Sequence, residues 1–401
     1  MKVLQINSVC GVGSTGRIVI DVDKILKDQG HESYVAYGRN FLKSYNSSIR
    51  IGNRFDNYSH VFRTRLFDKH GFGSKQATRE FINRIDDINP DIIHLHNIHG
   101  YYINIELLFK YLQAANKPVI WTLHDCWAFT GHCTHFDYIG CKKWKDICYE
   151  CPQKTSYPSS ILMDNSKENF IKKKELFTGI ENMTIVTPSK WLARIVKGSF
   201  LGKYPVNVIH NGIDLNVFKP IKNNFREKYK LTNKFIILGV ANIWEEKKGF
   251  NYFLDLSREI KKNESIVMVG LTKKQKAKLP KNIIGVPRTN STKELAEIYS
   301  EADVLINPTL EDNFPTTNLE ALACGTPVIT FDTGGSSETI SEDTGFIVAK
   351  EDLKELMKKI QIVKERGKLK YLKPCVKRAN NLYNKEEKFI EYINLYNRKY
   401  L

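Results

Sequence analysis

Two acidic residues and a pair of threonines stand within one short stretch in the second half of the chain. Asp312 and Glu320 are separated by seven residues, and Thr316 and Thr317 lie between them at the expected start of a helix that ends at Gly325. The first turn of a helix has unpaired backbone N–H groups, which form a seat for phosphate. Carboxylates on either side can accept hydrogen bonds from hydroxyl groups. The pattern therefore suits a ligand that joins a diphosphate to hydroxylated rings.

Two lysines form a second candidate anion site. Lys247 and Lys248 follow the apolar strand expected at Phe235–Ala241 and precede Gly249. A positive charge is unfavourable at the start of a helix, so an anion beside these lysines is expected. Cations placed there would stabilise charge that builds on a leaving diphosphate. The alternative is two ordinary surface lysines.

A glycine-containing loop near the N-terminus resembles a phosphate-binding turn. It follows the strand expected at Val3–Asn7 and leads into a helix expected over Ile18–Leu26. Glycine lets the backbone approach a ligand closely. As a dinucleotide fingerprint the G-x-G-x-x-G spacing is a weak signal, because no clear acidic residue ends a second strand about twenty residues later. The loop residues expected to face the ligand are Gly13, Ser14, Thr15 and Gly16.

Together these motifs resemble the GT-B retaining glycosyltransferases of family 4. Asp312 and Glu320 match the E-x7-E signature, with Asp in place of the first Glu, and the run EALACGTPVI follows at 320–329. The sequence NGID at 211–214 is also familiar in that family. The block HDCWAFTGHC at 124–133 is similar to a bacterial subgroup that builds surface polysaccharides. The resemblance covers nearly the whole chain.

The resemblance implies an α/β fold of the GT-B type, with two Rossmann-like doubly wound domains that face an interdomain cleft. We expect an acceptor-side domain over residues 1–217 and a nucleotide-sugar domain over 218–380. The final helix, residues 381–401, is expected to pack back on the first domain. The regular alternation of apolar strands and amphipathic helices agrees with such an architecture.

The family also implies roles for individual residues. The catalytic set is His124, Lys248 and Asp312, with His124 beside the donor sugar. The leaving diphosphate itself takes the proton of the acceptor, so that neither a protein nucleophile nor a catalytic metal is needed. Related enzymes carry Arg where this chain has Asn242, and Lys247 is the expected substitute for that charge. The donor-binding set is Gly13, Ser14, Thr15, Gly16, Asn242, Lys247, Lys248, Asp312, Phe314, Pro315, Thr316, Thr317 and Glu320.

Four cysteines lie close together in the first domain. Cys133, Cys141, Cys148 and Cys151 are separated by seven, six and two residues. In a chain expected to be cytosolic, four thiols that end in C-x2-C favour a structural zinc site over disulfides. Four thiolates would leave no open position for catalysis. Reduced cysteines without metal and one disulfide pair are the alternatives.

Three histidines and an aromatic helix permit two interpretations each. His94, His96 and His99 could bind a metal, but no carboxylate accompanies them, and we expect them to line the cleft or the core. In the stretch 54–75, aromatic residues recur at helical spacing among arginines. Either this stripe packs on the domain, or it is an amphipathic surface that leans into an anionic bilayer.

Composition limits the class of protein. The chain has 401 residues, 42% of them hydrophobic, and a formal net charge of +17. It contains neither an apolar run long enough to span a membrane nor a signal peptide, so we expect a cytoplasmic protein. The positive charge implies an anionic partner, such as a phosphorylated substrate, acidic lipid or nucleic acid. No recognised nucleic-acid motif is present, and nucleic acid is therefore not expected.

The sequence thus predicts a retaining hexosyltransferase. It would move a sugar from a nucleotide-sugar donor to a glycan or polyprenyl-linked acceptor in capsule, O-antigen or exopolysaccharide synthesis. It would be cytoplasmic and peripheral on the inner face of the plasma membrane. The alternatives are an epimerase-like GT-B enzyme that processes UDP-sugar without an acceptor, and a non-catalytic protein that binds glycan or nucleic acid.

Overall fold

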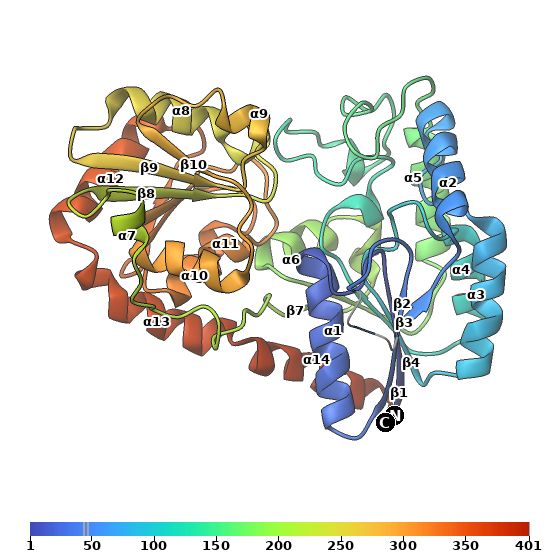
Figure 1. Ribbon diagram of the computed structural model, residues 1–401. Coiled ribbons are helices and arrows are strands. Elements are labelled where there is room, and N and C mark those ends of the chain that lie inside the picture. Colours follow the sequence, from blue (N-terminus) through green and yellow to red (C-terminus); the bar gives the residue numbers. More distant parts are fainter. Residues whose placement is uncertain (43–44, 46–47, 401) are drawn as a thin grey trace. The chain divides into compact units, whose positions relative to one another are not determined.

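The computed structural model describes residues 1–42, 45 and 48–400, and the chain divides into two compact units (Figure 1). Unit 1 comprises residues 1–209 together with 389–401, and unit 2 comprises residues 210–388. The sequence analysis placed the division at 217/218 and the return at 381. Each unit is a parallel sheet covered by helices.

Unit 1 contains a sheet of seven parallel strands. They are β1 (Lys2–Asn7), β2 (Glu32–Tyr37), β3 (Ser48–Arg50), β4 (Ile92–Leu95), β5 (Val119–Thr122), β6 (Met183–Thr187) and β7 (Val206–Val208). Their order is β3-β2-β1-β4-β5-β6-β7, so the winding reverses between β1 and β4. In open α/β sheets ligands bind beyond the carboxyl ends of the strands at such a reversal.

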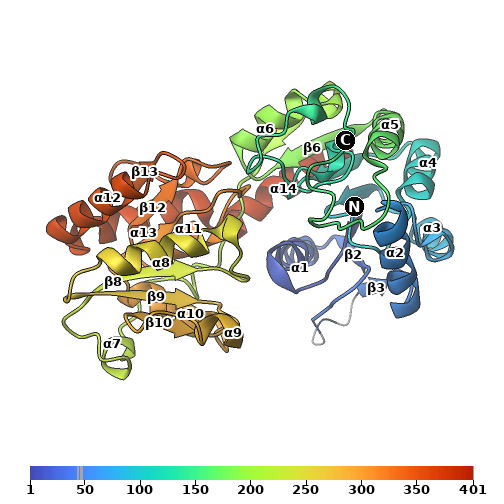
Figure 2. The same cartoon turned by 90° about the horizontal axis from the view of Figure 1, so that it is seen from above.

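Successive residues of these strands point to opposite faces of the sheet, and helices bury both faces. On one face Val3 and Ile92 pack with α1 (Gly13–Asp28) and with residues of α14 (Lys385–Tyr400). Figure 2 shows α1 and α14 near one another. The other face is covered by helices whose bounds are α3 (Lys75–Ile88), α4 (Ile105–Ala115), α5 (Ser166–Phe177) and α6 (Lys190–Lys197).

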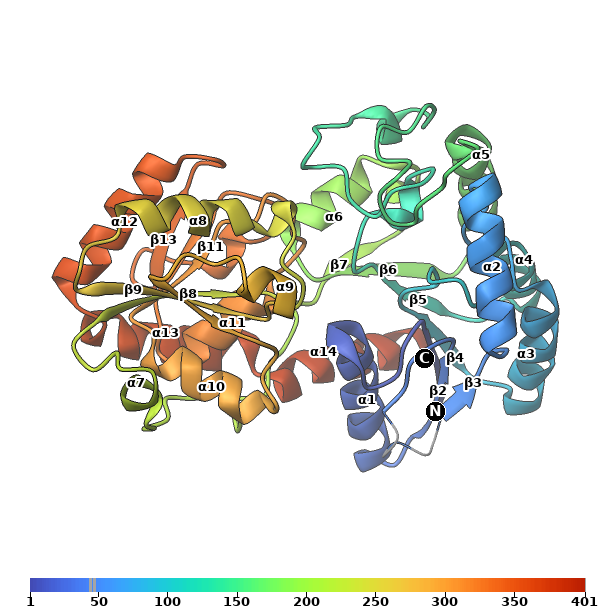
Figure 3. The same cartoon turned by 45° about the horizontal axis from the view of Figure 1, so that its top comes forward.

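Unit 2 contains a sheet of six parallel strands. They are β8 (Phe235–Val240), β9 (Glu264–Val269), β10 (Ile283–Val286), β11 (Val304–Asn307), β12 (Val328–Phe331) and β13 (Gly345–Val348). The order β10-β9-β8-β11-β12-β13 reverses between β8 and β11. The helices are α7 (Phe225–Lys228), α8 (Phe250–Glu259), α9 (Lys273–Lys276), α10 (Thr292–Glu301), α11 (Thr316–Ala323), α12 (Leu353–Arg366) and α13 (Leu369–Tyr383). Figure 3 shows α8 on one face of the sheet and α10, α11 and α13 on the other.

The α/β fold with two doubly wound sheets is therefore confirmed, with local differences from the expectation. Strands β3 and β13 were not predicted. The long final helix is interrupted at Asn384, because the backbone of Ile213 pairs there: Ile213 N–H donates to the Tyr383 carbonyl at 2.8 Å, and Lys385 N–H donates to the Ile213 carbonyl at 3.1 Å. Within the described part of the chain, no helix is both long and apolar enough to cross a bilayer.

Candidate active site

Two loops meet at the point where the strand order of unit 2 reverses. Residues 241–249 follow β8, and residues 308–315 follow the neighbouring strand β11. The Leu310 N–H donates to the carbonyl oxygen of Lys247 at 2.8 Å, and the Thr309 hydroxyl donates to the same oxygen at 3.2 Å. The backbone therefore holds the lysine-bearing loop against the acidic loop.

Two lysines of the first loop form ion pairs with two acidic residues of the second loop. The Lys248 ammonium lies 2.7 Å from Oδ2 of Asp312 and donates to the carbonyl oxygen of Glu311 at 3.2 Å. The Lys247 ammonium lies 3.0 Å from Oε1 of Glu311, whose side chain is buried. The structure thus brings the three predicted residues Lys247, Lys248 and Asp312 together. Glu311 is a fourth member that the sequence analysis missed, because no motif spacing singles it out.

The backbone at Asp312 requires a glycine opposite it. Gly334 has φ +57°, and a Cβ atom built there would lie 1.7 Å from the carbonyl oxygen of Asp312. Real Cβ atoms do not approach a backbone oxygen so closely, so a larger residue would displace the acidic loop. Gly334, in the loop after β12, therefore helps to set the position of Asp312.

The N-terminus of α11 begins four residues after Asp312 and presents backbone N–H groups that the helix itself does not pair. Pro315 is its N-cap and supplies no side-chain hydrogen bond, and the first turn carries no acid. The N–H groups of Thr316 and Thr317 therefore have no acceptor from the helix itself.

Phe314, just before the helix, stacks on the imidazole of His210 with ring centroids 4.8 Å apart. Asn242 lies exposed in the lysine-bearing loop.

A buried tyrosine forms a hydrogen bond to the carboxylate of Glu320. The glutamate side chain is mostly buried, and its Oε2 accepts a hydrogen bond from the Tyr299 hydroxyl at 2.9 Å. Burial, followed by the charge of Glu320, raises the pKa of Tyr299 well above its ordinary value. Tyr299 therefore remains a hydrogen-bond donor and fixes one carboxylate oxygen. No motif spacing in the sequence connects Tyr299 with Glu320.

His124 follows β5 in unit 1 and packs against another histidine. Its ring is stacked on that of His96 with centroids 5.5 Å apart, and Nε2 of His124 lies 3.2 Å from Nδ1 of His96. Burial lowers the pKa of His124 to about 4. The imidazole is therefore neutral at physiological pH and can offer both a donor and an acceptor.

The neighbouring histidines make contacts with protein groups. His94 is buried, and its two ring nitrogens lie 2.6 Å from the Tyr396 hydroxyl and 2.8 Å from the Thr122 hydroxyl. His99 lies 2.8 Å from Oδ2 of Asp125. The burial of His94 agrees with the expected core position. The sequence analysis placed no carboxylate beside these histidines, and Asp125 corrects that statement for His99.

The glycine loop forms the first turn of α1, which begins at Gly13 and not at Ile18 as predicted. The Gly11 N–H donates to the carbonyl oxygen of Gly16 at 2.9 Å, which folds the loop back on the helix start. The first turn, containing Gly13, Ser14, Thr15 and Gly16, carries no acid.

These residues and His124 lie on unit 1, whereas Asn242, Lys247, Lys248, Asp312, Phe314, Pro315, Thr316, Thr317 and Glu320 lie on unit 2.

Helix α2 (Arg54–Phe67) exposes its aromatic face and buries polar residues, unlike an ordinary surface helix. Phe55, Tyr58 and Phe62 are 78%, 72% and 63% exposed, whereas its buried residues are the polar His60 and Thr64. His60 explains this orientation, because its ring accepts from the Gly71 N–H at 3.0 Å and contacts the Ser74 hydroxyl at 3.0 Å. The expectation that the aromatic stripe packs on the domain is therefore wrong.

The exposed surface continues beyond α2. The Ile161 N–H donates to the carbonyl oxygen of Arg65 at 2.7 Å, and the Met163 N–H donates to that of Leu66 at 3.2 Å. This places the exposed side chains of Ile161, Leu162 and Met163 next to the end of the helix. The α2 surface, as we call it, consists of Phe55, Tyr58, Phe62, Ile161, Leu162 and Met163 with the exposed bases Arg54, Arg63, Arg65 and Lys69.

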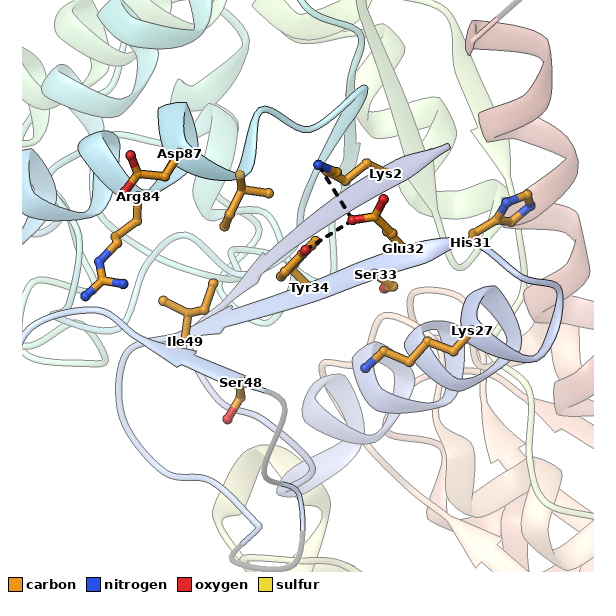
Figure 4. Close-up of a pocket in the computed structure, with 11 residues that line it drawn as sticks. Lys2, Lys27, His31, Glu32, Ser33, Tyr34, Ser48, Ile49, Arg84 and Asp87 are labelled. Carbon is orange, nitrogen blue, oxygen red and sulfur yellow. Dashed lines mark hydrogen bonds and ion pairs between the residues drawn. The ribbon is translucent and has the colours of Figure 1, made fainter.

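A cavity of about 660 Å³ opens at the opposite end of the unit 1 sheet, beside the first residues of β1 and β2 (Figure 4). There Glu32 lies 3.6 Å from the Lys2 ammonium and accepts from the Tyr34 hydroxyl at 3.2 Å. Ligands of open α/β sheets bind at the carboxyl ends of the strands, and this cavity lies at the amino ends. We do not assign it to the active site.

Two family profiles match the chain. The profile described as Glycosyltransferase Family 4 matches residues 15–217, and the profile described as Glycosyl transferases group 1 matches residues 234–365. The first of them alone covers half of the chain.

Individual relatives agree with these profiles. The glycosyl transferase WcaC of Escherichia coli, named for colanic acid biosynthesis, is 24% identical over 424 residues and aligns with 99% of both chains. A Campylobacter jejuni N-acetylgalactosaminyltransferase, named for an undecaprenol-diphosphate substrate, is 27% identical over 200 residues, which cover 47% of this chain and 52% of its own. The crystal structure of HepE from Anabaena in complex with UDP superposes with a TM-score of 0.70 at 14% identity, over 99% of this chain and 100% of that chain. This last likeness shows that the folds correspond.

Proposed function

This chain belongs to glycosyltransferase family 4, and we propose on that premise that it transfers a hexose-type sugar from a nucleotide-sugar donor, with retention at the anomeric carbon. The acceptor we propose is a glycan or a polyprenyl-linked sugar in the synthesis of a surface polysaccharide. The name of WcaC supports the polysaccharide, the name of the Campylobacter enzyme supports a lipid-linked acceptor, and the complex of HepE supports a nucleoside diphosphate.

The observation that carries the proposal is the charge arrangement at the strand reversal of unit 2. Two lysines are held by acids on the adjoining loop, next to a helix whose N-cap residue supplies no side-chain hydrogen bond. Two ammonium groups and the free N–H groups of a helix start can together accommodate the negative charges of a diphosphate. Because Asp312 already positions Lys248, the cation needs little reorganisation when the ligand binds.

The proposed reaction needs no nucleophile from the protein. The bond between the anomeric carbon and the diphosphate oxygen breaks, while the acceptor hydroxyl attacks from the same face. The acceptor proton passes to the departing phosphate oxygen, so charge is conserved. Lys248, with Lys247 beside it, stabilises the negative charge that develops on that oxygen. The same proposal includes no catalytic metal.

The other residues orient the donor. Glu320, held by Tyr299, would accept hydrogen bonds from the ribose hydroxyls, and Asp312 would accept from the sugar hydroxyls. Neutral His124 would provide a hydrogen bond to the sugar without placing a second positive charge near a developing oxocarbenium ion. That last role is taken from the family.

The α2 surface suits a peripheral attachment to an anionic membrane. On a helix the positions 55, 58 and 62 share one face, and Arg54, Arg65 and Arg63 flank it. Aromatic side chains between basic residues are the pattern of helices that lie in the interface of a bilayer with acidic lipids. A lipid-linked acceptor would be met at that surface. We therefore propose a cytoplasmic enzyme that docks on the inner face of the membrane through α2.

The decisive experiment is a thermal-shift screen with UDP-, GDP- and ADP-sugars, followed by product analysis with and without acceptor. A matching donor raises the apparent stability of the protein. Lys248→Ala and Glu320→Ala should then abolish donor turnover while the circular dichroism spectrum is unchanged. Lys273→Ala, which removes an exposed lysine from α9 of the same unit, is the control and should retain turnover.

The same experiment separates the alternatives. Conversion of the donor in the absence of any acceptor indicates an epimerase-like enzyme. Donor binding without any product indicates a binding protein. Full turnover in both Lys248→Ala and Glu320→Ala would remove the site assignment.

A further inference from the structure

The connection between β5 and α5 runs from residue 123 to residue 165 and contains only two short 3-10 helices, η1 (Trp127–Phe129) and η2 (Lys143–Lys145). Structureless loops of this length are uncommon in compact domains and need some other source of order. The aromatic rings of Phe129, Phe136 and Trp144 pack together inside it, with centroids 4.9–6.3 Å apart.

The four cysteines of this connection come together on one small cavity. Cys133, Cys141, Cys148 and Cys151 all line a space of about 20 Å³, although they come from three separate turns of the loop. That volume is about what one water molecule occupies, and it therefore suits a single ion. Cys126, a buried cysteine of the same loop, is not among the lining residues.

Three of the sulfur atoms have hydrogen-bond partners within the same loop. The thiols of Cys133 and Cys151 are hydrogen-bonded to each other. The Gly131 N–H donates to the sulfur of Cys148, and the Gln153 N–H donates to that of Cys151. Backbone N–H groups aimed at cysteine sulfur are a typical outer layer around metal-bound thiolates, because each removes part of the negative charge.

A buried histidine provides an independent observation at the same cavity. The side chain of His132 is fully buried and lines the cavity. Its Nδ1 lies 2.5 Å from Oδ1 of Asp68, whereas its Nε2 has no hydrogen-bond partner among the described residues. A buried polar nitrogen without a partner is costly, so a group that it can contact is expected in the cavity.

A buried ammonium lies next to the same loop. The side chain of Lys173 on α5 is buried and donates to the carbonyl oxygens of Trp127 at 2.8 Å and Thr130 at 3.1 Å. Burial lowers the pKa of Lys173 to about 7, while the charges of Cys148 and Cys133 raise it in part. A positive charge in this position would offset the excess negative charge of four thiolates around a divalent ion.

We propose that Cys133, Cys141, Cys148 and Cys151 bind one Zn²⁺ as thiolates in a closed tetrahedral site, beside the buried Nε2 of His132. Binding releases the four thiol protons. Four thiolates select zinc among the common divalent ions and leave no position for substrate, so the ion orders the loop and takes no part in transfer. This proposal is independent of the transferase activity.

The side chains must adjust to complete the site. Among the residues that the structure describes, no group of three or more His, Cys, Asp or Glu side chains is already arranged as a metal site. Cysteine has one side-chain torsion, and rotation between its staggered positions redirects the sulfur without movement of the backbone. The breaking of the Cys133–Cys151 hydrogen bond is part of this adjustment.

The test uses the full chain with a tag that contains no histidine, purified under reducing conditions without chelator, and measures metals by inductively coupled plasma mass spectrometry. We expect about one zinc ion per chain. Cys148→Ser with Cys151→Ser should lose it, and so should Cys133→Ser. Cys126→Ala, which removes a neighbouring buried thiol outside the cavity, should keep it.

Because the cysteine variants could fail to fold, the unaltered protein is tested too. Titration with a mercurial thiol reagent should release zinc, and replacement by Co²⁺ should give the intense visible bands of a tetrahedral thiolate site. Zinc far below one per folded chain would overturn the proposal, as would a Cys133–Cys151 disulfide in the freshly purified protein.

Discussion

The ammonium nitrogen of Lys248 lies 2.7 Å from Oδ2 of Asp312, although the two residues are 64 positions apart in the chain. They meet because β8 and β11 are neighbours at the reversal of the strand order, so that the loops after them share one edge of the sheet. The side chain of Lys248 is 38% exposed. A solvent-exposed ion pair contributes little to the free energy of unfolding. In the proposed function this pair holds the cation ready for the diphosphate.

Replacement of Lys248 should therefore separate activity from stability. We expect Lys248→Ala to lower kcat by roughly 100-fold or more, since one preorganised charge at the leaving group is lost. The free energy of unfolding should change by less than about 1 kcal/mol. Steady-state kinetics and chemical denaturation measure the two quantities, with Lys273→Ala as control. A large loss of stability with normal kcat would contradict this role.

Tyr299 is expected to act through Glu320. Tyr299→Phe removes only the hydroxyl that donates to Oε2 of Glu320 at 2.9 Å and keeps the buried ring. A hydrogen bond to a charged group is worth enough that the KM for the donor should rise by about 10- to 100-fold. We expect kcat to change less than KM. A variant with unchanged KM and a lower melting temperature would indicate a purely structural tyrosine.

Gly334 can be tested against a second glycine with a similar backbone conformation. Gly334 has φ +57° and faces the carbonyl oxygen of Asp312, whereas Gly30 has φ +78° and nothing within 4 Å of its built Cβ. Gly30→Ala should cost about 1 kcal/mol from backbone strain alone. Gly334→Ala should cost more, and it should also lower kcat/KM by about 100-fold, because Asp312 must move. Equal effects of the two variants on activity would refute the positioning role.

Stability should fall as the pH drops below about 6.5. Burial lowers the pKa of His60 and His94 to about 3 and that of His124 to about 4. In the unfolded chain these histidines bind protons near pH 6.5, whereas in the folded chain they stay neutral until pH 4 or below. The unfolded state thus binds more protons between these values, and the free energy of unfolding decreases with decreasing pH.

The measurement is the melting temperature from pH 7.5 to pH 4.5, a window in which most carboxylates remain ionised. We expect a fall of at least about 4 °C. His94→Gln should make the fall shallower, because it removes one of the depressed histidines. A flat profile would show that these side chains are not sequestered from protons.

The α2 surface predicts binding to anionic vesicles. The double change Phe62→Glu and Arg63→Glu should weaken binding to phosphatidylcholine vesicles that contain phosphatidylglycerol by roughly 10-fold or more, since it removes an aromatic anchor and reverses a charge. The control is Asn83→Glu with Arg84→Glu on α3, which makes the same change in net charge on another exposed helix face. Equal sedimentation of both double variants with the vesicles would exclude α2 as the docking helix.

Much of this protein could be predicted from its sequence because the relevant signals are local. Apolar runs such as those of β1, β4 and β12 mark buried parallel strands, and the spacing of Asp312, Thr316 and Glu320 depends only on one loop and one helix. Such patterns reflect backbone geometry and burial within a few residues. They determine the α/β class and the candidate donor-binding stretch.

Other features depend on contacts between distant segments and were decided only by the tertiary structure. Glu311 and Tyr299 acquire their roles from Lys247 and Glu320, which local spacing does not reveal. The aromatic face of α2 turns outward because the polar His60 is needed to bind backbone groups at Gly71. An amphipathic pattern shows that a helix has two faces, but the partners available in the folded chain decide which of them is buried.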